Sequence, residues 1–210
     1  MFIELIDGLR CTSDHPSICL VAAIGEREDR QVIEGTLGCP TCRREYPIHR
    51  GIVSFGAGAQ VDSTSGSFVS LDPLDEDGAV RIGAFLNVME GITIALVGKW
   101  ARYASAVADL VGLRAFAINP LETVIESDRV GVLQTDNRLP FKSGSLRGVA
   151  IDASGWSDID VARSTHALAA GGRLVAPASA AVPDDIEEIA RDDACWIGEK
   201  RGALVALHRR

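Results

Sequence analysis

The sequence predicts an α/β protein in which a mostly parallel sheet, covered by helices on both faces, follows a small β-rich module. Three observations lead to this prediction. Cysteine and histidine residues form two short clusters within the first 42 residues. Beyond residue 92, short apolar segments alternate with amphipathic helices, the pattern of parallel strands buried on both faces. Between these regions, residues 56–67 are small and polar, as in a linker.

The two clusters near the start of the chain have the spacing of metal ligands. Cys11 and His15 form the first, and Cys39 and Cys42 form the second. A Cys-x2-Cys pair that faces another Cys/His cluster about two dozen residues away is typical of a zinc ribbon. Pro40 fixes the turn between the second pair, so both sulfurs lie on one side and backbone N–H groups can point at them.

The sequence leaves three candidates for the fourth ligand, which are His15, Asp14 and Cys19. Zinc prefers sulfur and nitrogen donors to a lone carboxylate, which disfavours Asp14. Cys19 lies in an apolar run, where a free cysteine behaves as a small buried hydrophobe, so we select His15. The alternative for the whole set is reduced core thiols without a metal. The predicted zinc ligands are Cys11, His15, Cys39 and Cys42.

The residues around the second cluster predict short strands. Alternating apolar residues over 18–23 and the segment 32–37 indicate a hairpin with a charged turn at 25–30. The segment from Cys39 to Phe55 resembles the end of the small zinc-ribbon proteins that activate tRNA and protein methyltransferases. In that family a Tyr-Pro-Ile-x-x-Gly-Ile/Val strand follows the second knuckle. The resemblance covers residues 1–55 and departs at the first knuckle, where Cys-x3-His replaces Cys-x2-Cys.

The rest of the chain alternates helices and strands. A helix starts at Asp72-Pro73, an N-cap with proline at the first helical position. A further helix covers 100–111, and another extends to Ala169 and ends at Gly171-Gly172. Cys195 lies in a predicted strand and is expected to be buried. The other apolar runs predict strands over 92–97, 114–119, 130–133, 146–151, 173–176 and 203–207.

Two segments give the second region a family resemblance. The residues around Leu139-Pro-Phe141 resemble the Asp-x-x-x-Leu-Pro-Phe segment of class I S-adenosylmethionine-dependent methyltransferases, and Leu168–Val175 resembles their Leu-x-Pro-Gly-Gly-x-Leu turn. The resemblance covers roughly residues 85–210 and implies a Rossmann-like fold. It also implies that Asp136 contacts the adenine of the cofactor.

The expected cofactor site departs from the family at its main positions. Family members follow their first strand with Gly-x-Gly-x-Gly, because a Cβ there would block the cofactor. This chain keeps only Gly98 and places Trp100 nearby. The second strand ends in Asn119 instead of the acid that binds the ribose. We therefore expect vestigial contacts at Gly98, Asn119 and Asp136, no catalytic residue, and no useful S-adenosylmethionine binding.

Composition narrows the function classes. The chain has 210 residues, a net charge of −8 and 5% aromatic residues, which disfavours nucleic-acid binding through a basic or stacking surface. No apolar run approaches the length of roughly 20 residues that crosses a membrane. An odd cysteine count and the lack of a signal-peptide pattern favour a reduced, cytoplasmic setting.

The sequence thus predicts a zinc ribbon over 1–55, a linker over 56–71 and a methyltransferase-like domain over 72–210. The favoured function is a pseudo-methyltransferase that binds a protein partner, such as a methyltransferase, or associates with itself. The alternatives are an active methyltransferase with a built-in activator ribbon and a binder of another small molecule. We also expect the ribbon to dock on its own chain and bury Tyr46, Ile48, Ile52 and Phe55.

Overall fold

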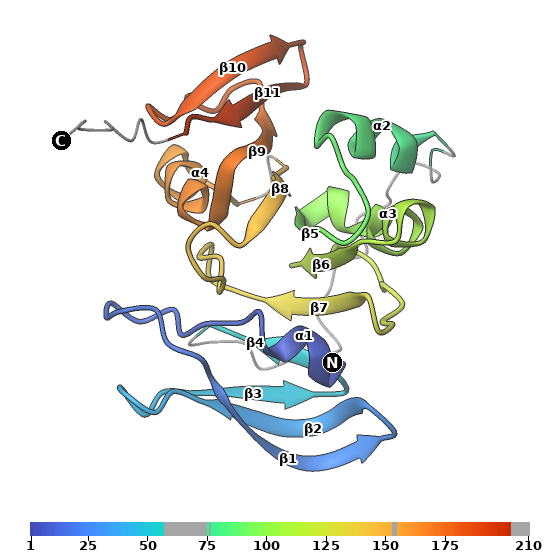
Figure 1. Ribbon diagram of the computed structural model, residues 1–210, viewed down its shortest axis with the longest axis vertical. Helices are drawn as coiled ribbons and strands as arrows, with labels where there is room; N and C mark the ends of the chain where they lie inside the picture. The colour runs from blue at the N-terminus through green and yellow to red at the C-terminus, as the bar shows by residue number, and fades with distance from the viewer. Residues whose placement is uncertain (57–74, 76, 153–154, 203–210) are drawn as a thin grey trace, which may run out of the picture.

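A single mixed sheet runs through the molecule from end to end (Figure 1). The computed structural model describes residues 1–56, 75, 77–152 and 155–202. The described strands number eleven and have the order β1-β2-β3-β4-β7-β6-β5-β8-β9-β11-β10. Helices lie on both faces of its parallel part, so the predicted α/β fold is confirmed.

The N-terminal part forms one edge of the sheet. Strands β1 (Val21–Glu28), β2 (Gln31–Gly38), β3 (Glu45–His49) and β4 (Ile52–Ser54) pair in antiparallel order. The predicted hairpin is present, but its turn is shorter than residues 25–30. Strand β1 continues through the charged residues to Glu28, with irregular pairing after Ile24, because backbone pairing with β2 does not require apolar side chains. The short helix α1 (Ile3–Ile6) packs beside these strands.

This edge joins the rest of the sheet through one parallel strand pair. Val53 of β4 pairs with Leu133, and Phe55 N–H donates to Gln134 O at 2.7 Å. Both partners belong to β7 (Val130–Gln134). A single hydrophobic cluster contains buried side chains from both sides of this junction, including Tyr46, Ile48, Phe55, Leu133 and Phe141. Of the side chains expected to be covered, Ile52 is only half-buried. The predicted boundary at residue 55 therefore does not separate two cores.

The central strands are parallel and doubly wound. The first strand of the parallel part is β5 (Thr93–Val97), and β6 (Arg114–Ile118) and then β7 lie on one side of it. The chain then crosses to β8 (Leu146–Ala150) and β9 (Leu168–Pro177) on the other side. The strand order reverses between β5 and β8, and this switch point is where ligands bind in such sheets.

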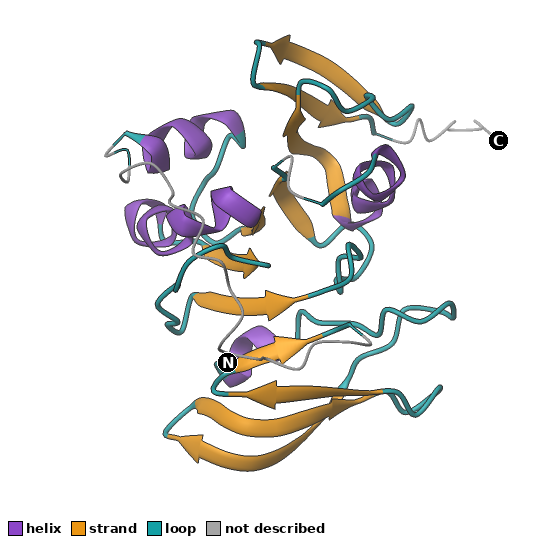
Figure 2. Cartoon of the chain, turned by 180° about the vertical axis from the view of Figure 1, so that it is seen from behind, coloured by secondary structure: helices purple, strands orange, loops and turns teal. Residues whose placement is uncertain are grey.

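The helices divide between the two faces of the sheet, as the views from both sides show (Figures 1 and 2). Helices α2 (Gly78–Phe85) and α3 (Ala104–Val111) share one apolar cluster with the 3₁₀ helix η1 (Gly98–Tyr103). Helices α1 and α4 (Asp158–Ser164) contribute Leu5, Ile6 and Val161 to the cluster on the opposite face. In the part of the chain that the structure describes, every helix is too short or too polar to span a membrane.

The far edge of the sheet differs from the sequence prediction. Helix α4 ends at Ser164 and passes through η2 (Thr165–Ala167), so the predicted helix up to Ala169 is wrong. Residues 168–177 form β9 instead, and Gly171-Gly172 lie inside it, where the pairing with β8 is irregular. A Cβ on Gly172 would lie 2.9 Å from Ala169 O, so the close backbone approach explains that glycine. Strand pairing has overridden the local helical pattern.

Two antiparallel strands complete this edge. Strand β11 (Cys195–Lys200) pairs with β9, and β10 (Ile186–Arg191) pairs with β11. Cys195 is buried, as predicted, whereas β10 was not predicted because most of its residues are exposed. The predicted helix start at Asp72-Pro73, most of the predicted linker and the predicted strand 203–207 lie outside the described residues.

Candidate functional site

The four predicted metal ligands lie together in one cluster. Their ligand atoms are all within 4.8 Å of one another, although they come from two loops that are distant in sequence. Cys11 Sγ lies 3.6 Å from Cys42 Sγ, and Cys39 Sγ lies 3.4 Å from His15 Nε2. Cys19, the alternative fourth ligand, is exposed and not buried as expected, and neither it nor Asp14 belongs to the cluster.

The distances in the cluster suit one tetrahedral ion. Zinc bonds of about 2.3 Å to sulfur and about 2.0–2.1 Å to nitrogen place two sulfurs about 3.8 Å apart. The same bond lengths place a sulfur and a nitrogen about 3.6 Å apart. The sulfur–sulfur separation of 3.6 Å and the sulfur–nitrogen separation of 3.4 Å are within a few tenths of an ångström of these values. The donor set of three thiols and one imidazole fits zinc chemistry.

Backbone hydrogen bonds shape the second knuckle between β2 and β3. Cys39 N–H donates to Arg44 O at 2.9 Å, and Arg43 N–H donates to Cys39 O at 2.9 Å. Arg43 has a φ of 58°, the left-handed conformation that reverses the chain tightly. This turn brings Cys39 and Cys42 to one side, as their spacing predicted.

The first knuckle is held by the sheet as well as by its own loop. Single β-bridges join Leu9 to Phe141 and Arg10 to Cys19, on either side of the ligands. The Tyr46 hydroxyl accepts a hydrogen bond from Thr12 N–H at 3.1 Å. Tyr46 is a buried residue of β3, so the knuckle is fixed to the core-facing side of that strand.

The environment of the ligands shifts their protonation. The Ser13 hydroxyl and the Arg44 N–H lower the pKa of Cys42 to about 6. The Pro16 carbonyl and then the Cys42 sulfur raise the pKa of His15 to about 9. Burial raises the pKa of Cys39. Zinc binds thiolates and neutral imidazole, so metal binding would release the protons that these ligands still carry.

The orientation of His15 leaves one ring nitrogen for an ion. Its Nδ1 lies 2.8 Å from Pro16 O, where a protonated nitrogen donates to the carbonyl. In that tautomer Nε2 carries the lone pair and faces the cysteine sulfurs. Such an outer hydrogen bond is the usual way in which a protein fixes a metal-binding histidine.

The three predicted cofactor contacts, Gly98, Asn119 and Asp136, follow the strands β5, β6 and β7 at their carboxyl ends. Gly98 has a φ of 61°, and a Cβ on it would lie 2.3 Å from Asp152 Oδ1. The Asp152 carboxylate accepts from Lys99 N–H at 2.7 Å. Hence an acidic side chain is packed directly against the turn that follows β5.

Asn119 and Asp136 have neighbours from the protein itself. Asn119 Oδ1 accepts from Thr135 N–H at 2.8 Å, and its Nδ2 donates to Thr135 O at 2.9 Å. The amide thus extends the pairing of β6 with β7. Asp136 is exposed and lies beside Gly56, where an added Cβ would be 2.3 Å from Asp136 Oδ1.

A cavity of about 300 Å³ lies at the switch point. Its lining combines Lys99, Trp100 and Asp152 with Asp192 and Cys195 from the far edge of the sheet. The sequence analysis did not identify Asp192 as a residue of this cavity. No local motif marks Asp192, which caps the turn before β11 by accepting from Cys195 N–H at 2.7 Å.

In comparisons with known proteins, this chain is similar only to solved structures. No protein-family model and no curated protein matches the chain. The [4+2]-cyclase SpnF matches with a TM-score of 0.39 and 18% identity, over 47% of this chain and 43% of that chain. The complex of the Haloferax volcanii Trm112 methyltransferase activator with its partner matches with a TM-score of 0.40 and 23% identity, over 47% of this chain and 50% of that chain.

A third match is a Methanococcus maripaludis protein named as an S-adenosyl-L-methionine-dependent methyltransferase. It gives a TM-score of 0.41 and 13% identity, over 61% of this chain and 85% of that chain. This chain spans half or less of the length of SpnF and of the Haloferax protein that it matches. These matches concern the fold of only part of this chain. The activity, substrates and partners of this protein are therefore treated as proposals.

Proposed function

We propose that the chain is a zinc-binding pseudo-methyltransferase that acts as a protein-binding module. In this proposal the parallel sheet retains the fold of a methyltransferase and does not bind S-adenosylmethionine usefully. The observation that carries the proposal is the bonding of Asn119, whose amide oxygen and nitrogen are both engaged by Thr135. By the resemblance of the sequence, this is where an active member holds the ribose.

In this proposal the zinc ion has a structural role. Four protein ligands complete the tetrahedral shell, which leaves no open position for a reacting water or substrate. The ion would join the first knuckle to the turn before β3 and so fix the sheet edge formed by β1–β4. In a small module of this kind, the free energy of metal binding is also free energy of folding.

The protein-binding part is supported by the exposed edge of the sheet. Strand β1 is the last strand on its side, and all eight of its residues are exposed. Among them Val21 and Ile24 are large apolar side chains with 62% and 45% exposure. Edge strands of this kind are surfaces for pairing with another chain, either a partner or a second copy.

An active methyltransferase is the second candidate, and the cavity at the switch point favours it. The cavity of about 300 Å³ lies where doubly wound sheets bind their ligands. One measurement separates the candidates: isothermal titration of the zinc-loaded full chain with S-adenosylmethionine. The pseudo-methyltransferase should give no binding stronger than about 10 µM, on the scale where each tenfold is about 1.4 kcal/mol. A tighter constant would overturn the proposal in favour of the enzyme.

A further inference from the structure

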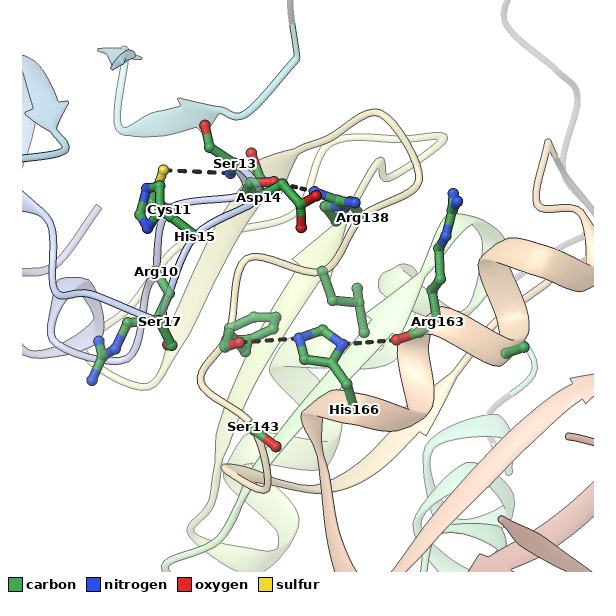
Figure 3. A pocket seen from close by; sticks show the side chains of 14 residues that line it. Arg10, Cys11, Ser13, Asp14, His15, Ser17, Arg138, Ser143, Arg163 and His166 are labelled. Carbon is green, nitrogen blue, oxygen red and sulfur yellow. Dashed lines mark hydrogen bonds between the residues drawn. The ribbon is translucent and has the colours of Figure 1, made fainter. Parts of the chain in front are cut away.

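A second cavity, of about 400 Å³, lies beside the metal cluster and is not explained by the proposed function. Figure 3 shows its walls, which come from three separate parts of the chain. The first knuckle, from Arg10 to Ser17, forms one wall. The segment after β7, up to Ser143, forms the second, and the end of α4 with His166 forms the third.

The charges at this cavity are mainly positive, although the chain as a whole has a net charge of −8. Arg138 and Arg163 come from different walls of this cavity, and Figure 3 labels both. Arg10 points away in that view and donates to the carbonyl oxygens of Asp7 and Leu9. Asp14 is the one acidic residue among the described residues of the lining. A local cluster of cations in an acidic protein indicates attraction for an anion.

The two arginines keep donors for a ligand. Arg138 donates through one nitrogen to Thr12 O, and a guanidinium has five N–H groups in all. Arg163 lies 3.8 Å from Asp160 Oδ1, a long contact, and its side chain is 60% exposed. Their planar groups suit the bidentate recognition of phosphate oxygens.

The remaining lining suits the organic part of a ligand. Leu139 and Phe141 are almost fully buried beneath the cavity, and Ser17 and Ser143 add hydroxyl-bearing side chains to its lining. His166 lies between two backbone carbonyls, with Nδ1 2.7 Å from Arg163 O and Nε2 3.3 Å from Phe141 O. The ring is therefore a fixed wall. The cavity volume is in the range of small-molecule sites.

We propose that this cavity binds a small phosphorylated organic molecule, with Arg138 and Arg163 holding the phosphate. The hydroxyl groups add donors, and the apolar floor receives the carbon part of the ligand. Asp14 opposes the anion and limits its affinity. This inference does not depend on whether the switch point binds S-adenosylmethionine.

Isothermal titration of the zinc-loaded full chain with inorganic phosphate and with phenyl phosphate tests the proposal. Phenyl phosphate should bind more tightly than inorganic phosphate. Arg163→Ala should weaken binding about tenfold or more, because it removes hydrogen bonds to a charged group. Asp14→Asn should strengthen it. Arg27→Ala, which removes the same charge from exposed β1, is the matched control and should leave binding unchanged.

Several results would overturn this assignment. They are no binding of either probe, equal weakening by Arg27→Ala and Arg163→Ala, weaker binding in Asp14→Asn, or no preference for phenyl phosphate. Arg138→Ala should also weaken binding, with the zinc content measured in parallel because Arg138 contacts the first knuckle. If that variant loses zinc, Arg163→Ala decides the question, because Arg163 belongs to α4 and not to either knuckle.

Discussion

The hydroxyl of Tyr46 lies 3.1 Å from Cys11 Sγ, so a buried residue of the sheet reaches directly into the metal cluster. Tyr46 is 2% exposed, and its ring packs against that of Phe55 at a tilt of 37°, with 4.6 Å between centroids. Phe55 in turn follows the strand that pairs with β7. The metal cluster, the core of the N-terminal strands and the parallel sheet are thus connected through consecutive contacts.

The first prediction concerns metal content. Elemental analysis of purified protein should find about one zinc per chain, since the cluster has four ligand atoms, the number that a tetrahedral zinc site requires. Cys39→Ser should lose the metal and loosen the strands β1–β4, because the ion supplies folding free energy. Cys19→Ser is the matched control, as Cys19 is exposed and outside the cluster. Equal zinc in Cys39→Ser and the unchanged protein would contradict the site.

A second prediction identifies the fourth ligand. His15→Ala should release zinc to a chelator much faster than the unchanged protein does, because it removes the one nitrogen donor from the cluster of four ligand atoms. Cys19→Ala should retain it. Chelator-release kinetics measured on both variants distinguish the two residues. The opposite pattern, with zinc lost only in Cys19→Ala, would assign the ligand to Cys19.

Tyr46→Phe should keep the fold and the zinc but speed metal release. The change removes the hydroxyl that contacts Cys11 Sγ and Thr12 N–H, and it leaves the buried ring in place. A hydrogen bond to a charged group contributes about 1.5–3 kcal/mol, so a loss of stability of that order is expected. Urea unfolding and chelator release provide the measurements.

Tyr103→Phe is the control for this variant, because Tyr103 is also buried but belongs to the cluster on the other face of the sheet. It should leave metal release unaltered. If both variants release zinc at the same rate as the unchanged protein, Tyr46 has no part in holding the knuckle.

Asn119→Asp should destabilise the protein and should not create S-adenosylmethionine binding. A carboxylate cannot donate to Thr135 O, which accepts from Asn119 Nδ2 at 2.9 Å. The variant loses this hydrogen bond and places a carboxylate oxygen against the carbonyl oxygen of Thr135. The free energy of unfolding should therefore fall by about 1–3 kcal/mol. Asn137→Asp makes the same change in an exposed bond to Gly155 O and should cost less. Denaturant unfolding and titration with the cofactor test both expectations, and cofactor binding gained by Asn119→Asp would favour a vestigial ribose site.

Cleavage of the predicted linker should leave one particle. The segments before and after the linker are joined by the pairing of β4 with β7 and by a shared hydrophobic cluster. These contacts do not require the linker to be intact. After limited proteolysis within residues 57–67, the fragments should run together on a sizing column and separate only in denaturant. Separation under native conditions would show that this junction is weaker than its contacts indicate.

The sequence by itself determined the elements whose signals are local. Fixed Cys/His spacing identified Cys11, His15, Cys39 and Cys42, and the structure brings the four together. Short apolar runs located β5 to β8, because a strand buried on both faces needs continuous apolar residues. The buried environment of Cys195 followed from the same reasoning.

Only the tertiary structure decided features that depend on pairing between distant segments. The parallel pairing of Val53 with Leu133 makes one sheet out of two predicted domains, and no local pattern specifies which strand edges meet. Gly171-Gly172 reads as a helix end but lies in β9, since pairing with β8 outweighs weak local preferences. Asn119 reads as a lost cofactor ligand, yet its amide joins two strand ends. In each case the deciding contact lies with a segment distant in sequence.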